Sequence, residues 1–147
     1  MAITVPPAAR LDYALAKAYL ARDTMERRLF ERLERLPRHF HLTINHRNDD
    51  HFDPSNDTIA WDPYSALRTK RGGTQSPALG LGHEVAHAVE SPARESVLMN
   101  RPLRNYDNDE ERRVICGTER HAAKTLGEAI RYDHRGTTFR VATPVSR

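Results

Sequence analysis

Residues 76–91 read SPALGLGHEVAHAVES, an apolar stretch that carries two histidines four positions apart. Ser76 followed by Pro77 is typical of a helix start, because serine caps free backbone N–H groups and proline suits the first helical position. A second Ser-Pro pair at 91–92 ends the pattern. The stretch therefore predicts a buried helix from Ser76 to about residue 90, and we expect it to be the central helix of the fold.

The two histidines of this helix form a possible metal site. His83 and His87 lie one turn apart on the same helical face, so both imidazoles can bind one ion. Glu84 is too close to the first ligand to bind the same ion, and it is placed to contact the ion's water instead. This H-E-x-x-H pattern predicts a zinc peptidase with His83 and His87 as metal ligands and Glu84 as the general base.

A catalytic zinc needs a third protein ligand. The metzincin solution, a later histidine, fails because Glu90 occupies the position where that motif has glycine. A glutamate from a later helix is the other common solution, and the candidates are Glu110, Glu111, Glu119 and Glu128. Glu111 is preferred because it lies in the first turn of a capped helix whose apolar residues would hold it against the core. Glu119 is the alternative.

Gly80 and Gly82 lie inside the predicted helix, where each lowers helix stability by around 1 kcal/mol relative to alanine. Such glycines need a compensating reason. We expect that another backbone segment passes close to the helix at these two glycines.

The composition fits a single domain of 147 residues with a net charge of +3. The densest basic segment, Arg22–Arg38, contains glutamates at helical spacing, which indicates a solvated helix rather than nucleic-acid binding. No apolar run is long enough to insert in a membrane, and the N-terminus lacks the pattern of a signal peptide. The single cysteine excludes an internal disulfide.

The patterns predict an α+β fold that is mostly helical, with a short antiparallel sheet and a long N-terminal helix. Residues 1–38 form a helical segment packed on the core, and residues 39–147 form the core itself. The strands are expected at His39–Asn45, Thr58–Trp61 and Thr138–Ala142. The segment Arg47–Asn56, with Asp49, Asp50, His51 and Asp53, is expected to be a solvated polar loop; a second metal site is the alternative. The segment 93–107 gives only weak signals and is expected to be a connection. Two helices follow, from 108 to 116 and from 118 to 126.

Four motifs carry a resemblance to a known family: NDTIAWDP (56–63), GGTQSPALGLGHEVAHA (72–88), EERRVICGTERHAAKTLGE (110–128) and RYDHRG (131–136). In this order they resemble the effector-type zinc metallopeptidases of bacterial secretion systems. These include the NleD-type proteases and the peptidase extensions of type VI VgrG and Rhs spike proteins. Residues 110–117 are also similar to the glutamate-ligand helix of clostridial neurotoxin light chains, which favours Glu111 as the third ligand.

This resemblance implies a gluzincin-like fold with one zinc ion and a protein or peptide substrate. It further implies a secreted effector without its own signal peptide, delivered by a spike protein or a larger parent chain. The protein would act in a target cell, in the bacterial periplasm or the host cytosol, and an immunity protein is a possible partner. Residues 1–38 carry no motif of the family.

A peptidase also needs a donor that stabilises the oxyanion. The segment Arg131–Arg135 supplies three suitable donor types, and His134 is preferred over Tyr132. An ordinary polar loop is the alternative interpretation of this segment. The strand Thr58–Trp61 is expected to be a sheet edge that pairs with an extended substrate.

Two other functions compete with the exported peptidase. The first is a non-catalytic, zinc-stabilised binding module, although a structural zinc site has no need of Glu84. The second is an intracellular regulatory metallopeptidase that acts in its own cell.

Overall fold

The computed structural model describes residues 3–147; Met1 and Ala2, which begin the predicted N-terminal segment, lie outside that range. The helices are α1 (Arg10–Leu20), α2 (Thr24–Arg35), α3 (Pro77–Ala88), α4 (Pro92–Met99), α5 (Asp109–Val114) and α6 (Arg120–Leu126), with a 3₁₀ turn at Pro7–Ala9 and a π-helical turn at Ile115–Glu119. The strands are β1 (Ile3–Thr4), β2 (Phe40–Ile44), β3 (His51–Asp53), β4 (Thr58–Trp61), β5 (Ser65–Arg68), β6 (Thr74–Gln75), β7 (Pro102–Leu103), β8 (Asp107–Asn108) and β9 (Thr137–Arg140). The predicted α+β class is confirmed.

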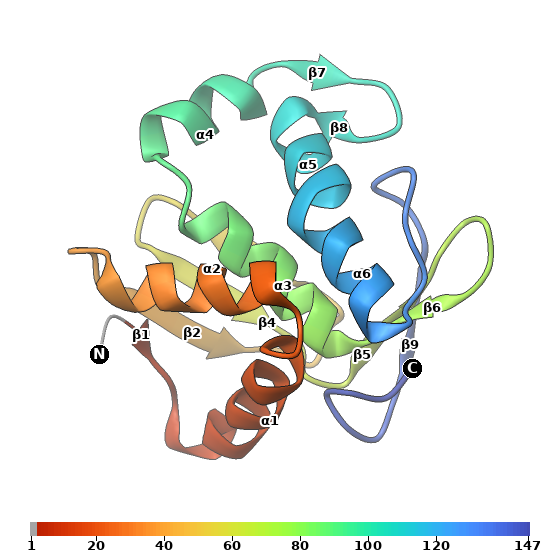
Figure 1. Ribbon diagram of the computed structural model, residues 1–147. Helices are drawn as coiled ribbons and strands as arrows, with labels where there is room; N and C mark the ends of the chain where they lie inside the picture. The colour runs from red at the N-terminus through yellow and green to blue at the C-terminus, as the bar shows by residue number, and fades with distance from the viewer. Residues whose placement is uncertain (1–2) are drawn as a thin grey trace.

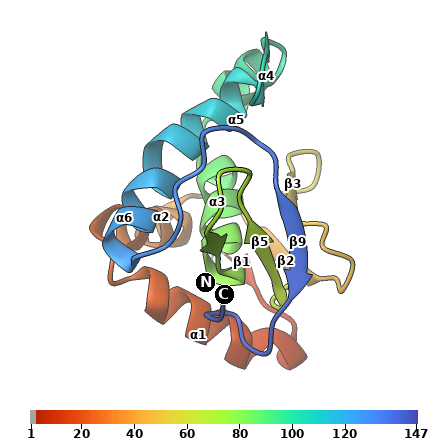
Figure 2. The ribbon, with the colours of Figure 1, turned by 90° about the vertical axis from the view of Figure 1, so that its right-hand side faces the viewer.

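Helix α3 is central, as the sequence predicted. The Ser76 hydroxyl accepts a hydrogen bond from the Leu79 N–H and caps its first turn. Every residue of α3 except Gly80 is buried. Figure 2 shows why: the strands lie on one side of the helix, and α2, α5 and α6 lie on the other.

The N-terminal segment is two helices rather than the single long helix predicted. α1 ends at Leu20, and α2 begins after Asp23, whose carboxylate accepts a hydrogen bond from the Glu26 N–H at 3.0 Å. This cap starts a new helix in a different direction (Figure 1), so the apolar residues of α1 and α2 reach α3 from two sides.

The main sheet has the strand order β1-β2-β4-β3, with β1–β2 and β2–β4 parallel and only β3–β4 antiparallel. The prediction of an antiparallel sheet is therefore wrong for this sheet, although the pairs β5–β6, β5–β9 and β7–β8 are antiparallel. The expected edge strand, Thr58–Trp61, is β4 and lies inside the sheet. The edge beside α3 is β3, from a segment that was expected to be a polar loop.

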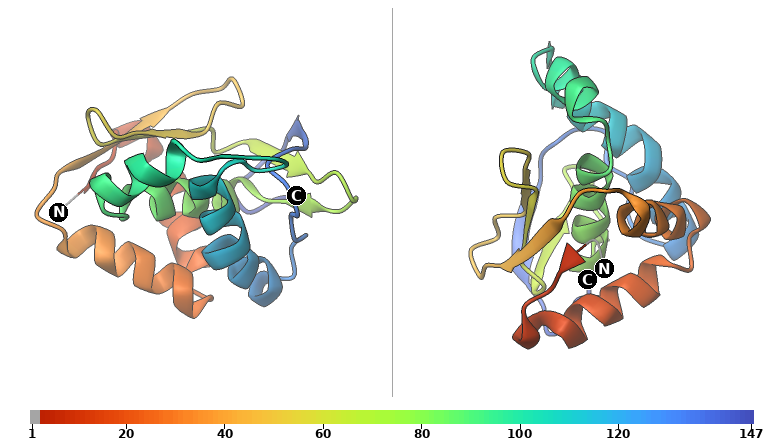
Figure 3. Two further views of the ribbon diagram at one scale, coloured as in Figure 1. Left: turned by 90° about the horizontal axis from the view of Figure 1, so that it is seen from above. Right: turned by 90° about the vertical axis from the view of Figure 1, so that its left-hand side faces the viewer.

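The segment 93–107, expected to be a plain connection, contains a helix and a hairpin. α3 ends at Ala88, and Ser91 caps α4, because its hydroxyl accepts a hydrogen bond from the Arg94 N–H at 3.4 Å. α4 and the β7–β8 hairpin lie together at one end of the molecule, beyond α3 (Figures 1 and 3).

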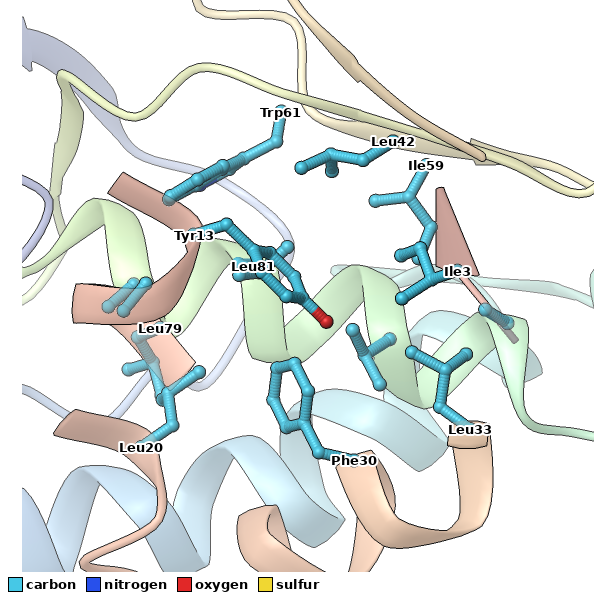
Figure 4. Close-up of a cluster of buried hydrophobic side chains, with 14 of the residues drawn as sticks. Ile3, Tyr13, Leu20, Phe30, Leu33, Leu42, Ile59, Trp61, Leu79 and Leu81 are labelled. Atoms are coloured by element: carbon cyan, nitrogen blue, oxygen red, sulfur yellow. The ribbon is translucent and has the colours of Figure 1, made fainter. Parts of the chain in front are cut away.

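The apolar core fixes the orientation of α3. Leu79 and Leu81 from α3 lie among Phe30 and Trp61, with aromatic and aliphatic side chains from both the helices and the sheet (Figure 4). The Trp61 indole N–H donates to the Pro77 carbonyl at 2.9 Å, which satisfies its one polar group inside the core. Between residues 3 and 147, no helix combines the length and apolar character that crossing a bilayer requires.

Candidate metal centre

Two histidines of α3 and a glutamate of α5 converge on one point. The Nε2 atoms of His83 and His87 lie 3.0 Å apart, and Glu111 Oε2 lies 2.9 Å from the first and 3.2 Å from the second. Ligands held at about 2.0–2.1 Å from one tetrahedral ion would lie about 3.3 Å from one another. The three side chains therefore match the spacing of a metal site, and both histidines are buried.

Glu111 reaches this point because of how α5 begins. The Asn108 side chain accepts a hydrogen bond from the Glu111 N–H at 2.9 Å and caps the helix. The first turn of α5 thus points its carboxylate at the histidine face of α3. The predicted preference for Glu111 over Glu119 agrees with this grouping of His83, His87 and Glu111.

The outward nitrogen of His87 is held by a second carboxylate. Glu110 Oε2 lies 2.7 Å from His87 Nδ1. Arg113, one turn further along α5, donates two hydrogen bonds to Glu110 at 2.7 and 2.8 Å and a third to the Ala86 carbonyl at 3.1 Å. A carboxylate on the far nitrogen fixes the tautomer and orientation of a ligating imidazole.

His83 has an equivalent arrangement built from other segments. Its Nδ1 lies 2.8 Å from Glu119 Oε1, and Glu119 is in turn bound by two nitrogens of Arg131, at 2.5 and 3.0 Å. Gln75 adds a weaker contact to Glu119 at 3.4 Å. Glu119, the alternative third ligand, therefore lies on the nitrogen of His83 that points away from Glu111.

A π-helical turn lets one helical segment supply both Glu111 and Glu119. In an uninterrupted α-helix, eight residues turn by about 800°, which would leave the two side chains about 80° apart around the axis. The π turn at Ile115–Glu119 interrupts that geometry, and both carboxylates contact His83. The predicted break at Gly117 is present as a kink within this turn.

These contacts shift the protonation equilibria of the site. Burial alone would lower the pKa of both imidazoles, but hydrogen bonds to Glu111 and Glu119 raise the pKa of His83 to about 9. Those to Glu110 and Glu111 raise the pKa of His87 to about 10. Burial acts in the opposite direction on the three carboxyls, but their pKa values lie below the usual range. The main cause is Arg113 for Glu110, Arg131 for Glu119, and the two histidines for Glu111. A metal ion would have to displace protons from both histidines.

Glu84 faces a cleft on the same side of α3. Its Oε1 lies 4.0 Å from His83 Nε2, and within residues 3–147 no group donates a hydrogen bond to its carboxylate. Two cavities meet here, of about 150 and about 190 Å³, and both are lined by Glu84, Asp50 and His134. Burial, with a smaller repulsion from Glu84, raises the pKa of Asp50 to about 8.

Both glycines of α3 make room for carboxylates, not for the backbone that was expected. A Cβ on Gly80 would lie 2.6 Å from Asp50 Oδ2, and one on Gly82 would lie 2.6 Å from Glu26 Oε2. Glu26 is fully buried, and its oxygens have no hydrogen-bond partner among the described residues. Burial is the main reason that its pKa is raised to about 8.

His134 reaches the site from the C-terminal segment. Its backbone N–H donates to the Asn105 carbonyl at 2.7 Å, and its Nδ1 lies 2.6 Å from Asp107 Oδ2. Its Nε2 lies 3.4 Å from Glu111 Oε2. Its ring is nearly parallel to the His83 ring, with 5.9 Å between the ring centroids. Asn105 and Asp107 both adopt positive φ, which asparagine and aspartate tolerate better than most residues.

Tyr132 is not brought to the metal ligands. Its ring is half-exposed and lies under the guanidinium groups of Arg71 and Arg120, at 3.9 and 5.1 Å. It does not line either cavity.

Sequence reasoning missed several residues around the site. They are Asp50, Glu95, Asp107, Glu110 as a partner of His87, Arg113 and Arg131. The spacing of Glu110 and Arg113, one turn apart in a capped helix, was the one signal available for them. Compared with protein-family models, curated proteins and solved structures, the chain gives no significant match, so the site is interpreted from its own geometry.

Proposed function

We propose that this protein is a zinc-dependent peptidase of the gluzincin type. One observation carries the proposal. His83, His87 and Glu111 converge within the spacing of a metal site, and Glu84 extends a free carboxylate into the cleft beside them.

Zinc is the metal that suits this set of ligands best. Two imidazoles and one carboxylate form the ligand set of many catalytic zinc sites, which leave a fourth position for water or substrate. A structural zinc site is usually closed by four protein ligands. Within residues 3–147 the group contains three, which favours the enzyme over a zinc-stabilised binding module.

The residues of the chain divide the chemistry between them. When bound, zinc lowers the pKa of water towards about 7 and polarises a carbonyl oxygen. Glu84 accepts the proton of the attacking water and returns it to the leaving amine. Its carboxylate suits this role because it is buried at the cleft wall and not held by another side chain.

We assign the oxyanion donor to His134 alone. Because Asp107 accepts a hydrogen bond from Nδ1, Nε2 is directed to the cleft on the Glu111 side of the site, and it donates to the oxyanion when the ring carries a proton on both nitrogens. Preorganised donors of this kind contribute roughly 10²–10³ to turnover. Tyr132 lies between two arginines instead.

An extended substrate would pair with the edge strand β3. Its residues His51 and Phe52 line the cleft beside Glu84, and β3 has a strand neighbour on one side only, β4. Main-chain pairing to an exposed strand is a common way to bind peptides.

The proposal is tested by metal analysis and peptide hydrolysis on the same set of variants. We expect one zinc per wild-type chain and its loss in His83→Ala and Glu111→Ala. Glu84→Gln should keep the zinc and the fold but hydrolyse unfolded casein about 10²–10⁴ times more slowly. Glu31→Gln, an exposed glutamate on α2, is the matched control. Full activity in Glu84→Gln would refute the peptidase mechanism.

The delivery of this peptidase into another cell rests on the similarity of the four motifs alone. On that basis we propose a secreted effector that acts in a target cell. Production in the bacterial cytoplasm and in the periplasm, scored by growth against Glu84→Gln, separates an exported antibacterial toxin from an enzyme of the producing cell. Growth arrest only in the periplasm supports the toxin, and growth arrest only in the cytoplasm contradicts it.

A further inference from the structure

Helix α4 buries a glutamate and exposes two of its apolar side chains, whereas Leu98 is half-buried. Glu95 is 3% exposed, whereas Val97 is 51% and Met99 46% exposed. Among the eight residues of this fully described helix, Glu95 is the only buried one. Glutamate is rarely buried without a partner, so packing alone does not account for this helix.

The carboxylate of Glu95 has no partner within the described part of the chain: no donor hydrogen-bonds to it and no cation pairs with it. The two nearest arginines are engaged elsewhere. Arg113 binds Glu110, and Arg38 binds Asp57 and the Ala88 carbonyl. Burial is the largest cause of the raised pKa of Glu95, and His87, Arg38 and Arg113 oppose it only from beyond ion-pair distance. A carboxylate at a cavity wall that has no ion-pair partner favours a cationic group in that cavity.

Glu95 forms part of the wall of the cavity of about 190 Å³ beside the metal ligands. His87 and Glu111 line the same cavity, so its contents lie next to the reacting centre. Phe52 from β3 and Met99 from α4 supply apolar walls. Of the residues that the structure describes, no lysine or arginine lines it.

We propose that this cavity binds a lysine or arginine side chain of the substrate, from a residue adjacent to the bond that is cleaved. The aliphatic part of such a side chain packs against Phe52 and Met99, and its charged end pairs with Glu95. This inference rests on the proposed peptidase function and adds the substrate class. Glu84 and Glu111 are committed to water activation and metal binding. Asp50, the remaining carboxyl of the lining, lies against Gly80 and accepts a hydrogen bond from the Asp62 N–H, which leaves Glu95 as the recognition group.

The test compares cationic side chains with neutral ones of the same shape. Otherwise identical fluorogenic peptides carry lysine or norleucine, and arginine or citrulline, at each position in turn. At one position next to the cleaved bond, we expect wild-type kcat/KM to be at least tenfold higher for the cationic member of each pair. Glu95→Gln should reduce that ratio to about two or less, with unchanged zinc content. Glu31→Gln should retain the wild-type ratio.

Binding measurements keep this inference separate from the peptidase proposal. Calorimetry on zinc-loaded Glu84→Gln should show the lysine peptide binding at least tenfold more tightly than the norleucine peptide, and the double variant with Glu95→Gln should lose the preference. Cleavage without a cation preference overturns the pocket and leaves the peptidase intact. If the wild-type protein cleaves none of the peptides, the peptidase proposal is refuted. The ratio of lysine-peptide to norleucine-peptide affinity then decides by itself whether the cavity binds a cationic side chain. If Glu95→Gln does not fold, the ratio measured on protein with Glu95 intact decides in the same way.

Discussion

The two histidines of the candidate metal site are held by matching arms of different origin. In the His87 arm, Glu110 and Arg113 come from one helix, α5, one turn apart. In the His83 arm, Glu119 comes from a π turn and Arg131 from the C-terminal segment. Each arm runs from imidazole to carboxylate to guanidinium.

The arms differ in how much water they reach. The Arg131 side chain is 10% exposed and Glu119 is almost fully buried, whereas Arg113 is 26% exposed and also lies 3.5 Å from Glu90. The His87 arm therefore has other partners and solvent available if one contact is lost. The His83 arm depends on one buried ion pair.

Removal of the carboxylate from each arm should give the largest difference between them. Glu119→Gln leaves the Arg131 charge buried without its partner, and we expect a loss of about 3–5 kcal/mol in the free energy of unfolding. Glu110→Gln leaves Arg113 with Glu90 and water, and the loss should be about 1 kcal/mol. Urea unfolding in EDTA measures both without a contribution from bound metal. Equal losses would mean that burial does not distinguish the arms.

Metal affinity should respond next most strongly, and in both arms. Loss of a carboxylate that orients a ligating histidine typically weakens metal binding about 10–100-fold. We expect this range for Glu110→Gln and for Glu119→Gln, measured by competition for zinc with a chelating dye. If the arms act independently, the double variant should lose roughly the product of the two factors. A double loss no larger than either single loss would show that one arm orients both rings.

Glu26, which lies on the His83 side of α3, should make the stability of the chain depend on pH. Its carboxyl lies against Gly82, and burial, with smaller repulsions from Asp23 and Glu119, raises its pKa to about 8. Between about pH 4.5 and 8 the folded chain keeps a proton that the unfolded chain releases, so stability falls as pH rises through this window. Glu26→Gln removes that loss.

We therefore expect Glu26→Gln to be more stable than wild type by about 1–2 kcal/mol at pH 9 and no more stable at pH 4, measured by thermal unfolding. Glu31→Gln, on the same helix but exposed, should give no pH-dependent gain. A constant difference at both pH values would assign the effect of Glu26→Gln to packing rather than to its charge.

The contacts of the His87 arm could have been predicted from helix spacing in the sequence, whereas those of the His83 arm could not. Helix spacing places His83 near His87 and Glu110 near Arg113 without knowledge of the fold. The caps of α3 and α5 were equally visible, and they orient the ligands. Glu119 was visible only as a candidate ligand, because its position depends on a π turn that residue spacing does not show.

Contacts between distant segments explain the other errors. The sequence gives no register between strands, so the parallel pairing of β2 with β4 and the edge position of β3 were missed. Asp50 looked like part of a solvated loop, but the fold places it against Gly80 in the cleft. Helix α4 was missed because its apolar residues do not face the core, and that same inversion marks Glu95 as unusual.

The smallest expected effect tests whether the His87 arm tolerates a weaker cation. Arg113→Lys keeps the charge beside Glu110 but loses the paired hydrogen bonds and the bond to the Ala86 carbonyl. Because Arg113 is partly exposed, we expect a loss of about 0.5–1 kcal/mol in unfolding free energy and little change in zinc affinity. Arg112→Lys, an exposed neighbour on α5, should change neither. If Arg113→Lys lost as much unfolding free energy as Glu119→Gln, the paired hydrogen bonds of the guanidinium would be essential to the His87 arm, and water could not replace them.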